Sequence, residues 1–250
     1  MESLFTPSSR LALFQFCRAQ PIFGFDFDGT LTPVIADRNA AWLPLGVRRR
    51  LARLARQVPC VVISGRGYSD VLRRVRGIPW QAVVGNHGAE SVPRLANLEK
   101  SEKLVREWHE FLQERFALFP GIDIEDKRFS LTIHYREVKD PKKALRFIQK
   151  TLKQLSAHHL IGGKLVVNLL PLGLPNKGTA LRMLQKRLKA PRAFYVGDDL
   201  TDEDVFVLGR PRTLFSVRIG KRRPSQARYY VPAQSDIEAL LDLLLEAVAR

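Results

Sequence analysis

The chain is poor in cysteine and in acidic residues. Cys17 and Cys60 are its two thiols in 250 residues, so a framework of several disulfides is excluded, and so few thiols are typical of a reducing compartment. Only 25 acidic residues stand against 41 basic ones, which gives a net charge of +16. This excess favours an anionic partner, such as nucleic acid, acidic lipid or a phosphorylated substrate.

Long apolar runs are also missing. None approaches the length of a membrane-spanning helix. The apolar stretch 11–17 lies between Arg10 and Arg18, and no small-residue cleavage site follows it, so we expect no membrane association and a cytoplasmic protein. The arginines of 47–56 and 182–192 recur at helical spacing, which is more typical of a solvated helix face than of a groove that reads nucleic acid.

Short apolar runs, each followed by a polar turn containing glycine, predict parallel strands that are covered on both faces. The helical patterns between them fit βαβ crossovers, so we predict an α/β fold with a Rossmann-like parallel sheet. Because the carboxyl ends of parallel strands lie at one edge of a sheet, the polar motifs there should converge. The runs are 21–29, 59–67, 81–90 and 192–200.

The middle of the chain has a different pattern. Apolar and polar residues alternate over 129–137, as they do in an antiparallel strand with one solvated face. We therefore predict a smaller α/β unit, residues 98–171, inserted as a cap into a discontinuous core of 1–97 and 172–250. The elements expected in this unit are helices at 103–118 and 141–155 and strands at 129–137 and 164–171.

Two carboxylates, Asp26 and Asp28, follow the first apolar run at the spacing that places side chains on one face of a strand. Desolvating two like charges side by side costs several kcal/mol each, as an order of magnitude, unless something compensates them. A divalent cation would do so, and carboxylate oxygens suit Mg²⁺. Asp198, Asp199 and Asp202 follow another strand, where they could join this site or merely complement a helix dipole.

Three further residues, two of them with polar side chains, suggest a bound anion. Lys177 begins a helical pattern, where a cation opposes the dipole, so it either faces an anion or is simply exposed to solvent. Ser64 and Gly65 lie between a strand and a helix. Their hydroxyl and N–H groups could hold a phosphoryl oxygen, or Ser64 could act as an N-cap.

In chain order, DFDGT, SGR, NKG and GDD resemble the motifs of haloacid-dehalogenase (HAD)-type phosphatases. Longer strings resemble one branch of that superfamily, the trehalose-6-phosphate phosphatases: DFDGTLTP, ISGR, GNHGAE, EDKRFSLTIHYR, LPLGLPNKG and VGDDLTDEDVF. The similarity covers residues 22 to about 206. It implies a HAD core with a cap domain and hydrolysis of a sugar phosphate, trehalose 6-phosphate above all.

The resemblance also implies catalytic roles. Asp26 would attack phosphorus and form an aspartyl-phosphate, while Asp28 would protonate the leaving sugar oxygen and later accept a proton from water. Ser64 and Lys177 would hold the phosphoryl oxygens.

A Mg²⁺ site is implied as well. The carboxylate of Asp26, the backbone carbonyl of Asp28 and Asp198 would be its ligands. Asp199 would bind directly or support the ligands, and Asp202 would have a supporting role.

Substrate contacts are implied in both parts of the chain. Asn168 stands where the family usually has a glutamate, and an amide makes a weaker hydrogen bond to a hydroxyl than a carboxylate does. A phosphatase of another glycosyl or hexose phosphate, such as glucosylglycerol phosphate or sucrose 6-phosphate, is therefore the alternative. The residues implied in substrate binding are Gly65, Arg66, Asn86 and His87 in the core, and Glu125, Lys127, Ser130 and Asn168 in the cap.

A non-catalytic nucleic-acid-binding relative is the remote alternative that the charge leaves open. The retention of Asp26, Asp28, Lys177 and Asp198 argues against it, and so does the lack of a basic stripe interleaved with aromatic residues. The basic stretch 220–228 is expected to be a surface loop.

Overall fold

The computed structural model describes residues 1–35, 37–91, 98–163, 165–210, 212–221 and 224–249. The chain divides into two compact units, one made of Met1–Leu95 and Pro175–Arg250 and the other of Ala96–Leu174. The end of the core segment expected at residue 97, and Arg222 and Arg223 of the basic stretch, lie outside the described residues.

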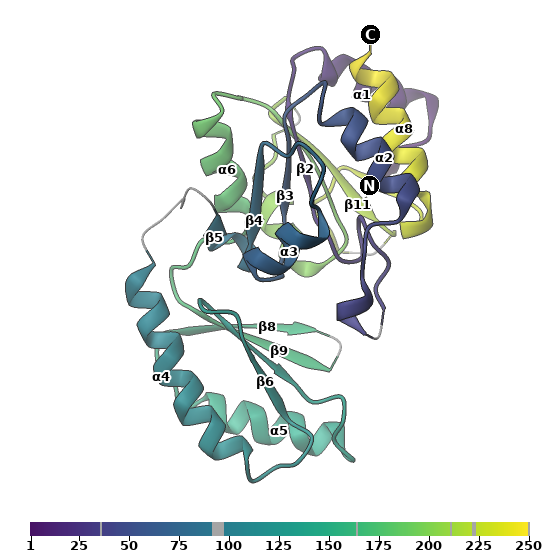
Figure 1. Cartoon of the computed structure of the whole chain (residues 1–250). Helices are drawn as coiled ribbons and strands as arrows, with labels where there is room; N and C mark the ends of the chain where they lie inside the picture. The colour runs from purple at the N-terminus through teal and green to yellow at the C-terminus, as the bar shows by residue number, and fades with distance from the viewer. Residues whose placement is uncertain (36, 92–97, 164, 211, 222–223, 250) are drawn as a thin grey trace. The chain divides into compact units, whose positions relative to one another are not determined.

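The first unit is built on one eight-stranded sheet (Figure 1). Its neighbouring strands are parallel, except that the last two in the order are antiparallel. The prediction of an α/β fold with a parallel sheet is therefore confirmed. The strand order is β1 (Glu2–Ser3), β12 (Tyr229–Val231), β11 (Leu214–Ile219), β10 (Ala193–Gly197), β2 (Ile22–Phe25), β3 (Cys60–Ile63), β4 (Ala82–Gly85) and β5 (Glu90–Ser91).

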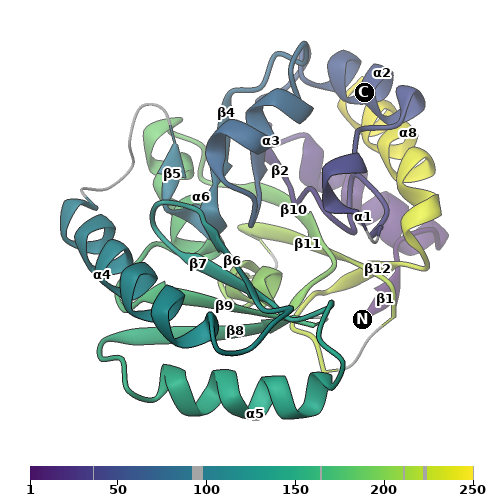
Figure 2. The same cartoon turned by 60° about the horizontal axis from the view of Figure 1, so that its bottom comes forward.

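Helices cover both faces of this sheet, because strand side chains alternate between two hydrophobic cores. Phe23 and Phe25 of β2 belong to one core and Ile22 to the other. The first core is covered by α1 (Pro7–Cys17), α2 (Leu45–Leu54), α3 (Tyr68–Arg74) and α8 (Ile237–Val248), and the second by α6 (Lys177–Arg187) and α7 (Glu203–Phe206); Figure 2 shows α1, α2 and α8 grouped together.

Short 3-10 helices follow several strands and loops. They are η1 (Arg38–Ala40), η2 (Asn86–Gly88), η3 (Leu200–Asp202) and η4 (Gln234–Asp236). None of the helices in the described part of the chain has the length and apolar character needed to cross a bilayer.

The strand expected over 21–29 is shorter than predicted. It ends at Phe25, because the backbone N–H groups of Leu31 and Thr32 donate to the Phe27 carbonyl, at 2.9 and 3.0 Å, and turn the chain. Asp26 and Asp28 therefore lie beyond the strand. The expectation that they share one strand face was wrong.

The second unit has a four-stranded antiparallel sheet with two helices on one face. Leu131, Ile133 and Leu169 of the sheet pack against Trp108 and Ile148 of the helices. The order is β6 (Asp123–Asp126), β7 (Leu131–His134), β9 (Val166–Pro171) and β8 (His158–Gly163), and the helices are α4 (Glu99–Phe116) and α5 (Pro141–Leu152).

The prediction of two strands in this unit was wrong, because there are four among its described residues. The strands that were missed, β6 and β8, are the edges of the sheet. Their side chains are largely exposed or half-buried, so neither segment carries the apolar signal by which β7 and β9 were predicted.

Candidate active site

A buried lysine joins two buried aspartates at the carboxyl edge of the parallel sheet. The Nζ of Lys177 donates to Oδ1 of Asp26 at 2.7 Å and to Oδ1 of Asp202 at 2.8 Å. The three side chains are 3%, 5% and 0% exposed. Asn176 caps α6, and Lys177 is the first residue of that helix. The anionic partner expected for this lysine is the pair of carboxylates of Asp26 and Asp202.

Asp202 is held by two further donors. Its Oδ1 accepts from the Tyr195 hydroxyl at 2.8 Å, and its Oδ2 accepts from the backbone N–H of Asp199 at 2.9 Å. The sequence argument missed Tyr195. The available signal was strand alternation, which places Tyr195 of β10 in the core that α6 covers. The Tyr195 ring packs so closely on Gly24 of β2 that a Cβ at Gly24 would lie 2.7 Å from it.

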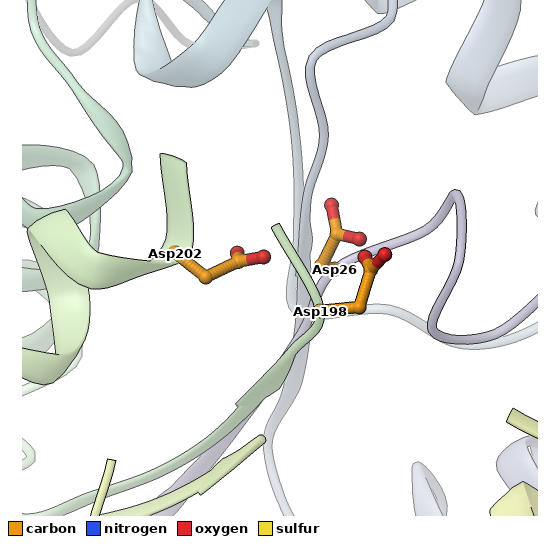
Figure 3. Close-up of side chains that lie close together, drawn as sticks. All are labelled: Asp26, Asp198 and Asp202. Carbon is orange, nitrogen blue, oxygen red and sulfur yellow. The ribbon is translucent and has the colours of Figure 1, made fainter. Parts of the chain in front are cut away.

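Asp198 completes a cluster of three carboxylates. One oxygen from each of Asp26, Asp198 and Asp202 lies within 4.8 Å of the others, and Figure 3 shows the Asp202 side chain directed toward the Asp26 and Asp198 carboxylates, which lie next to each other. Thr30 donates to Asp198 at 3.3 Å. Gly29 has a φ of +79°, and a Cβ there would collide with the Asp198 carboxylate, so both the turn and the close approach require glycine.

Burial disfavours charge in this cluster. It raises the pKa of Asp26 well above its ordinary value; Lys177 opposes the shift, and Asp202 and Asp198 add to it. Burial also raises the pKa of Asp198 to about 7. For Lys177 the effect of burial is outweighed by Asp202 and Asp26, so its pKa is raised and it stays protonated.

The cluster has the composition of a Mg²⁺ site. Its three carboxylates and one ammonium leave two negative charges when all are ionised, which is the charge that a divalent cation would balance. Hard oxygen donors of this kind suit Mg²⁺. Asp202 already accepts three hydrogen bonds from protein groups, so Asp26 and Asp198 are better placed to hold a cation.

The Asp28 carboxylate is paired with an arginine side chain. Arg66 donates to both of its oxygens, at 2.6 and 2.7 Å, and to Asp70 at 2.8 Å. Asp70 also accepts from Arg73 and Arg74. Although burial raises the pKa of Asp70, these three arginines lower it well below its usual range. Asp70 was also missed. It lies in the first turn of α3, four residues after Arg66, which stands in the bend before that helix.

Backbone hydrogen bonds link the loop after β3 to the loop after β4. The backbone N–H of His87 donates to the Ser64 carbonyl at 2.9 Å, and that of Asn86 donates to the Arg66 carbonyl at 2.6 Å. Asn86 and His87 have left-handed backbones with φ of 51° and 57°, which is unusual for residues other than glycine. A Cβ on Gly65 would lie 2.5 Å from the His87 ring, and the Ser64 hydroxyl accepts from the Arg66 N–H at 3.1 Å.

The predicted convergence of the polar motifs is confirmed in the first unit, by the pairs of Arg66 with Asp28 and of Thr30 with Asp198. Asp199 is not one of the three clustered carboxylates. Its side chain is exposed and accepts from the Leu200 N–H at 2.7 Å, where η3 begins.

In the second unit, Glu125 lies on the sheet face opposite the helices, and Lys127 and Ser130 lie in the turn between β6 and β7. The Glu125 carboxylate of β6 lies 3.2 Å from His134 Nε2, which donates to it when that nitrogen carries the proton, and 3.9 Å from the Lys127 ammonium. Ser130 is buried, and its carbonyl accepts from the Lys127 N–H at 3.0 Å. These side chains come from one hairpin.

Asn168 lies in the same polar row. Its Oδ1 accepts from the Thr132 hydroxyl at 2.8 Å and its Nδ2 donates to the Ile161 carbonyl at 3.3 Å. The register pairs Thr132 with Asn168 and with Glu125, so the three side chains lie across the sheet in one line.

Comparisons with known proteins agree with this arrangement. A family model described as trehalose-phosphatase matches residues 24–235. A trehalose-phosphate phosphatase of Mycobacterium tuberculosis H37Rv is 34% identical over 199 residues, which are 75% of this chain and 51% of that protein. The chain thus spans about half the length of the curated relatives it matches.

Solved structures show the same fold. The C-terminal domain of C. albicans trehalose-6-phosphate phosphatase has a TM-score of 0.75 at 23% identity, covering 99% of this chain and 98% of that one. A haloacid dehalogenase-like hydrolase from Bacteroides thetaiotaomicron has a TM-score of 0.64 at 15% identity, covering 89% and 98%.

Proposed function

We propose that this chain, which belongs to the trehalose-phosphatase family, is a Mg²⁺-dependent phosphatase that hydrolyses trehalose 6-phosphate to trehalose and phosphate. The observation that carries the proposal is the buried Asp26 carboxylate, which is held by Lys177 at 2.7 Å beside the carboxylate of Asp198. A carboxylate fixed in a desolvated site can act as a nucleophile toward phosphorus.

In this proposal Asp26 is the nucleophile. Lys177 donates to its Oδ1, so we assign the attack to Oδ2. The bond from Oδ2 to phosphorus forms as the bond from phosphorus to the sugar oxygen breaks, which gives an aspartyl-phosphate and free sugar. Water then attacks phosphorus, the bond from phosphorus to Oδ2 breaks, and inorganic phosphate leaves as the Asp26 carboxylate is regenerated.

Asp28 would handle the protons of both steps. It donates one to the departing sugar oxygen and takes one from the attacking water. Arg66 contacts both oxygens of Asp28, so we assign Arg66 the orientation of this carboxyl group. Ser64 and Lys177 would provide donors for the phosphoryl oxygens.

Asp26 and Asp198 would hold the metal ion. When bound, Mg²⁺ would polarise the phosphoryl group and offset charge in the transition state. The pKa of Asp198 is raised to about 7 in the metal-free protein, so a cation would also favour its ionised form.

The second unit would act as a cap that recognises the sugar. Glu125, Lys127 and Ser130 supply a carboxylate, an ammonium and a hydroxyl, groups that can hydrogen-bond several sugar hydroxyls. Asn168 would add an amide. Its Oδ1 already accepts from Thr132, so its contribution to a sugar would be small.

The test is phosphate release from a panel of sugar phosphates with Mg²⁺, using the wild type, Asp26→Asn and a wild-type sample in EDTA. The panel is trehalose 6-phosphate, glucosylglycerol phosphate, sucrose 6-phosphate, glucose 6-phosphate and mannose 6-phosphate. We expect a preference for the trehalose ester and loss of activity in EDTA. Asp26→Asn should lower kcat by more than about 10³-fold, because it removes the nucleophile.

A preference for another glycoside would support the proposed phosphatase reaction but not the proposed substrate, and Asn168 would be the first position to examine for specificity. Absence of phosphate release from every member would refute the phosphatase proposal.

A further inference from the structure

A single peptide group after β10 is held from both sides. It joins Asp198 to Asp199. Its N–H donates to Oδ2 of Asp202 at 2.9 Å, and its carbonyl accepts from Nη2 of Arg218 at 2.6 Å. The orientation of this peptide fixes ψ of Asp198, the residue whose carboxylate belongs to the cluster.

Arg218 is itself firmly placed. It is the β11 partner of Gly197, directly beside the end of β10, and its side chain is 4% exposed. Its Nη1 donates to Glu203 at 2.7 Å, and the other Glu203 oxygen accepts from the Gln226 N–H at 2.8 Å. Its Nε is buried without a hydrogen-bond partner among the described residues. Among the residues that the structure describes, Glu203 and the Asp198 carbonyl are therefore the groups to which the Arg218 side chain donates.

We propose that Arg218 is a positioning residue for the metal site, which it serves by clamping the carbonyl of Asp198 while Glu203 anchors the guanidinium. This inference rests on the proposed function, since it assumes that Asp198 is a metal ligand. The forked shape of the guanidinium explains why an arginine stands at this position. A guanidinium reaches a carboxylate and a carbonyl through separate nitrogens, whereas the single ammonium of lysine cannot reproduce both directions.

The consequence is a rigid ligand. Asp198 and Asp26 would repel each other as carboxylates, and without the clamp the Asp198 backbone could rotate to separate them. Metal binding would then have to restore the geometry against that relaxation. Loss of a group that orients a metal ligand typically weakens metal affinity by about 10- to 100-fold.

The experiment measures metal affinity directly. Mn²⁺ is the probe, because carboxylate sites that suit Mg²⁺ also accept it and its free form gives an EPR signal. The titrated proteins are the wild type, Arg218→Lys, Arg218→Met and the control Arg50→Met. Arg50 also bridges two carboxylates, those of Glu238 and Asp242 at 2.7 and 2.8 Å. The melting temperature of each metal-free protein is recorded alongside.

We expect Arg218→Lys to raise the Mn²⁺ dissociation constant about tenfold while its metal-free melting temperature stays near that of the wild type. Arg50→Met should leave the dissociation constant unchanged. An unchanged dissociation constant in Arg218→Lys would overturn the inference. So would losses of affinity that follow the losses of melting temperature across all three variants, because that pattern indicates general destabilisation. If the wild type itself binds no Mn²⁺, the metal site of the proposed function fails instead.

Discussion

The two units hold their charges in different ways. In the first, Lys177 lies 2.7 and 2.8 Å from its two carboxylates, and all three side chains are at most 5% exposed. In the second, Glu125 lies 3.9 Å from Lys127 and 3.2 Å from His134, and these side chains are between 10% and 22% exposed.

The difference follows from what each group of residues would do. A nucleophile must keep one position, and burial makes each of its charge interactions strong because water does not screen them. Residues that bind and release a sugar must exchange partners with water, which partial exposure and longer contacts allow. Disruption of the first arrangement should therefore cost far more than disruption of the second.

The largest effect is expected from Lys177→Met. It leaves Asp26 and Asp202 buried without their cation, so the free energy of unfolding in EDTA should fall by about 3–5 kcal/mol. Chemical denaturation measures it, with Arg50→Met as the control, since that variant breaks an ion pair at the surface. Equal losses in the two variants would remove the distinction between buried and exposed charge.

The pH dependence of the metal-free protein tests the same cluster. Asp198 has a pKa of about 7 in the folded chain, above that of an unfolded aspartate, so the folded state binds more protons between about pH 4 and 7. The free energy of unfolding should therefore fall as the pH rises through this window, by up to about 4 kcal/mol. The raised pKa of Asp26 acts in the same direction.

Denaturation at about pH 5 and about pH 7, in EDTA and in excess Mg²⁺, measures this dependence. Mg²⁺ binds ionised carboxylates and should flatten the slope. A slope that is the same with and without Mg²⁺ would mean that the cluster does not bind the ion.

Tyr195→Phe gives a smaller effect within the buried network. It removes only the hydroxyl that donates to Asp202, and a hydrogen bond to a charged group contributes about 1.5–3 kcal/mol to the free energy of unfolding. Tyr229→Phe is the control, because Tyr229 is buried in the same sheet and stacked on Phe215. Equal losses in the free energy of unfolding for the two variants would mean that the hydrogen bond to Asp202 adds nothing measurable to stability.

The smallest effect is expected in the second unit. Thr132→Val removes the donor to Asn168, and we expect KM for trehalose 6-phosphate to change by about two- to fivefold with kcat unchanged, as for one neutral hydrogen bond. Thr151→Val is matched, since its hydroxyl donates to Phe147 within α5. A fall in kcat comparable to that of a core variant would contradict a role limited to the proposed sugar binding.

Much of the candidate site was predictable from the sequence, whereas the edge strands of the second unit were not. The carboxyl ends of parallel strands must lie at one edge, so the positions of Asp26, Ser64 and Asp198 followed from their place after apolar runs. The edge strands β6 and β8 did not follow, because a largely exposed segment has no apolar period to detect.

Strand patterning and chain order are local properties, so the residue types at the ends of the core strands could be recognised from the sequence. Which cationic side chain pairs with each carboxylate depends instead on how distant segments fold together. Lys177 lies 151 residues from Asp26, and Arg66 lies 38 residues from Asp28. Tyr195 and Arg218 read as ordinary strand residues until β10 and β11 are packed beside α6 and α7, since such pairings depend on distances between segments that local pattern does not encode.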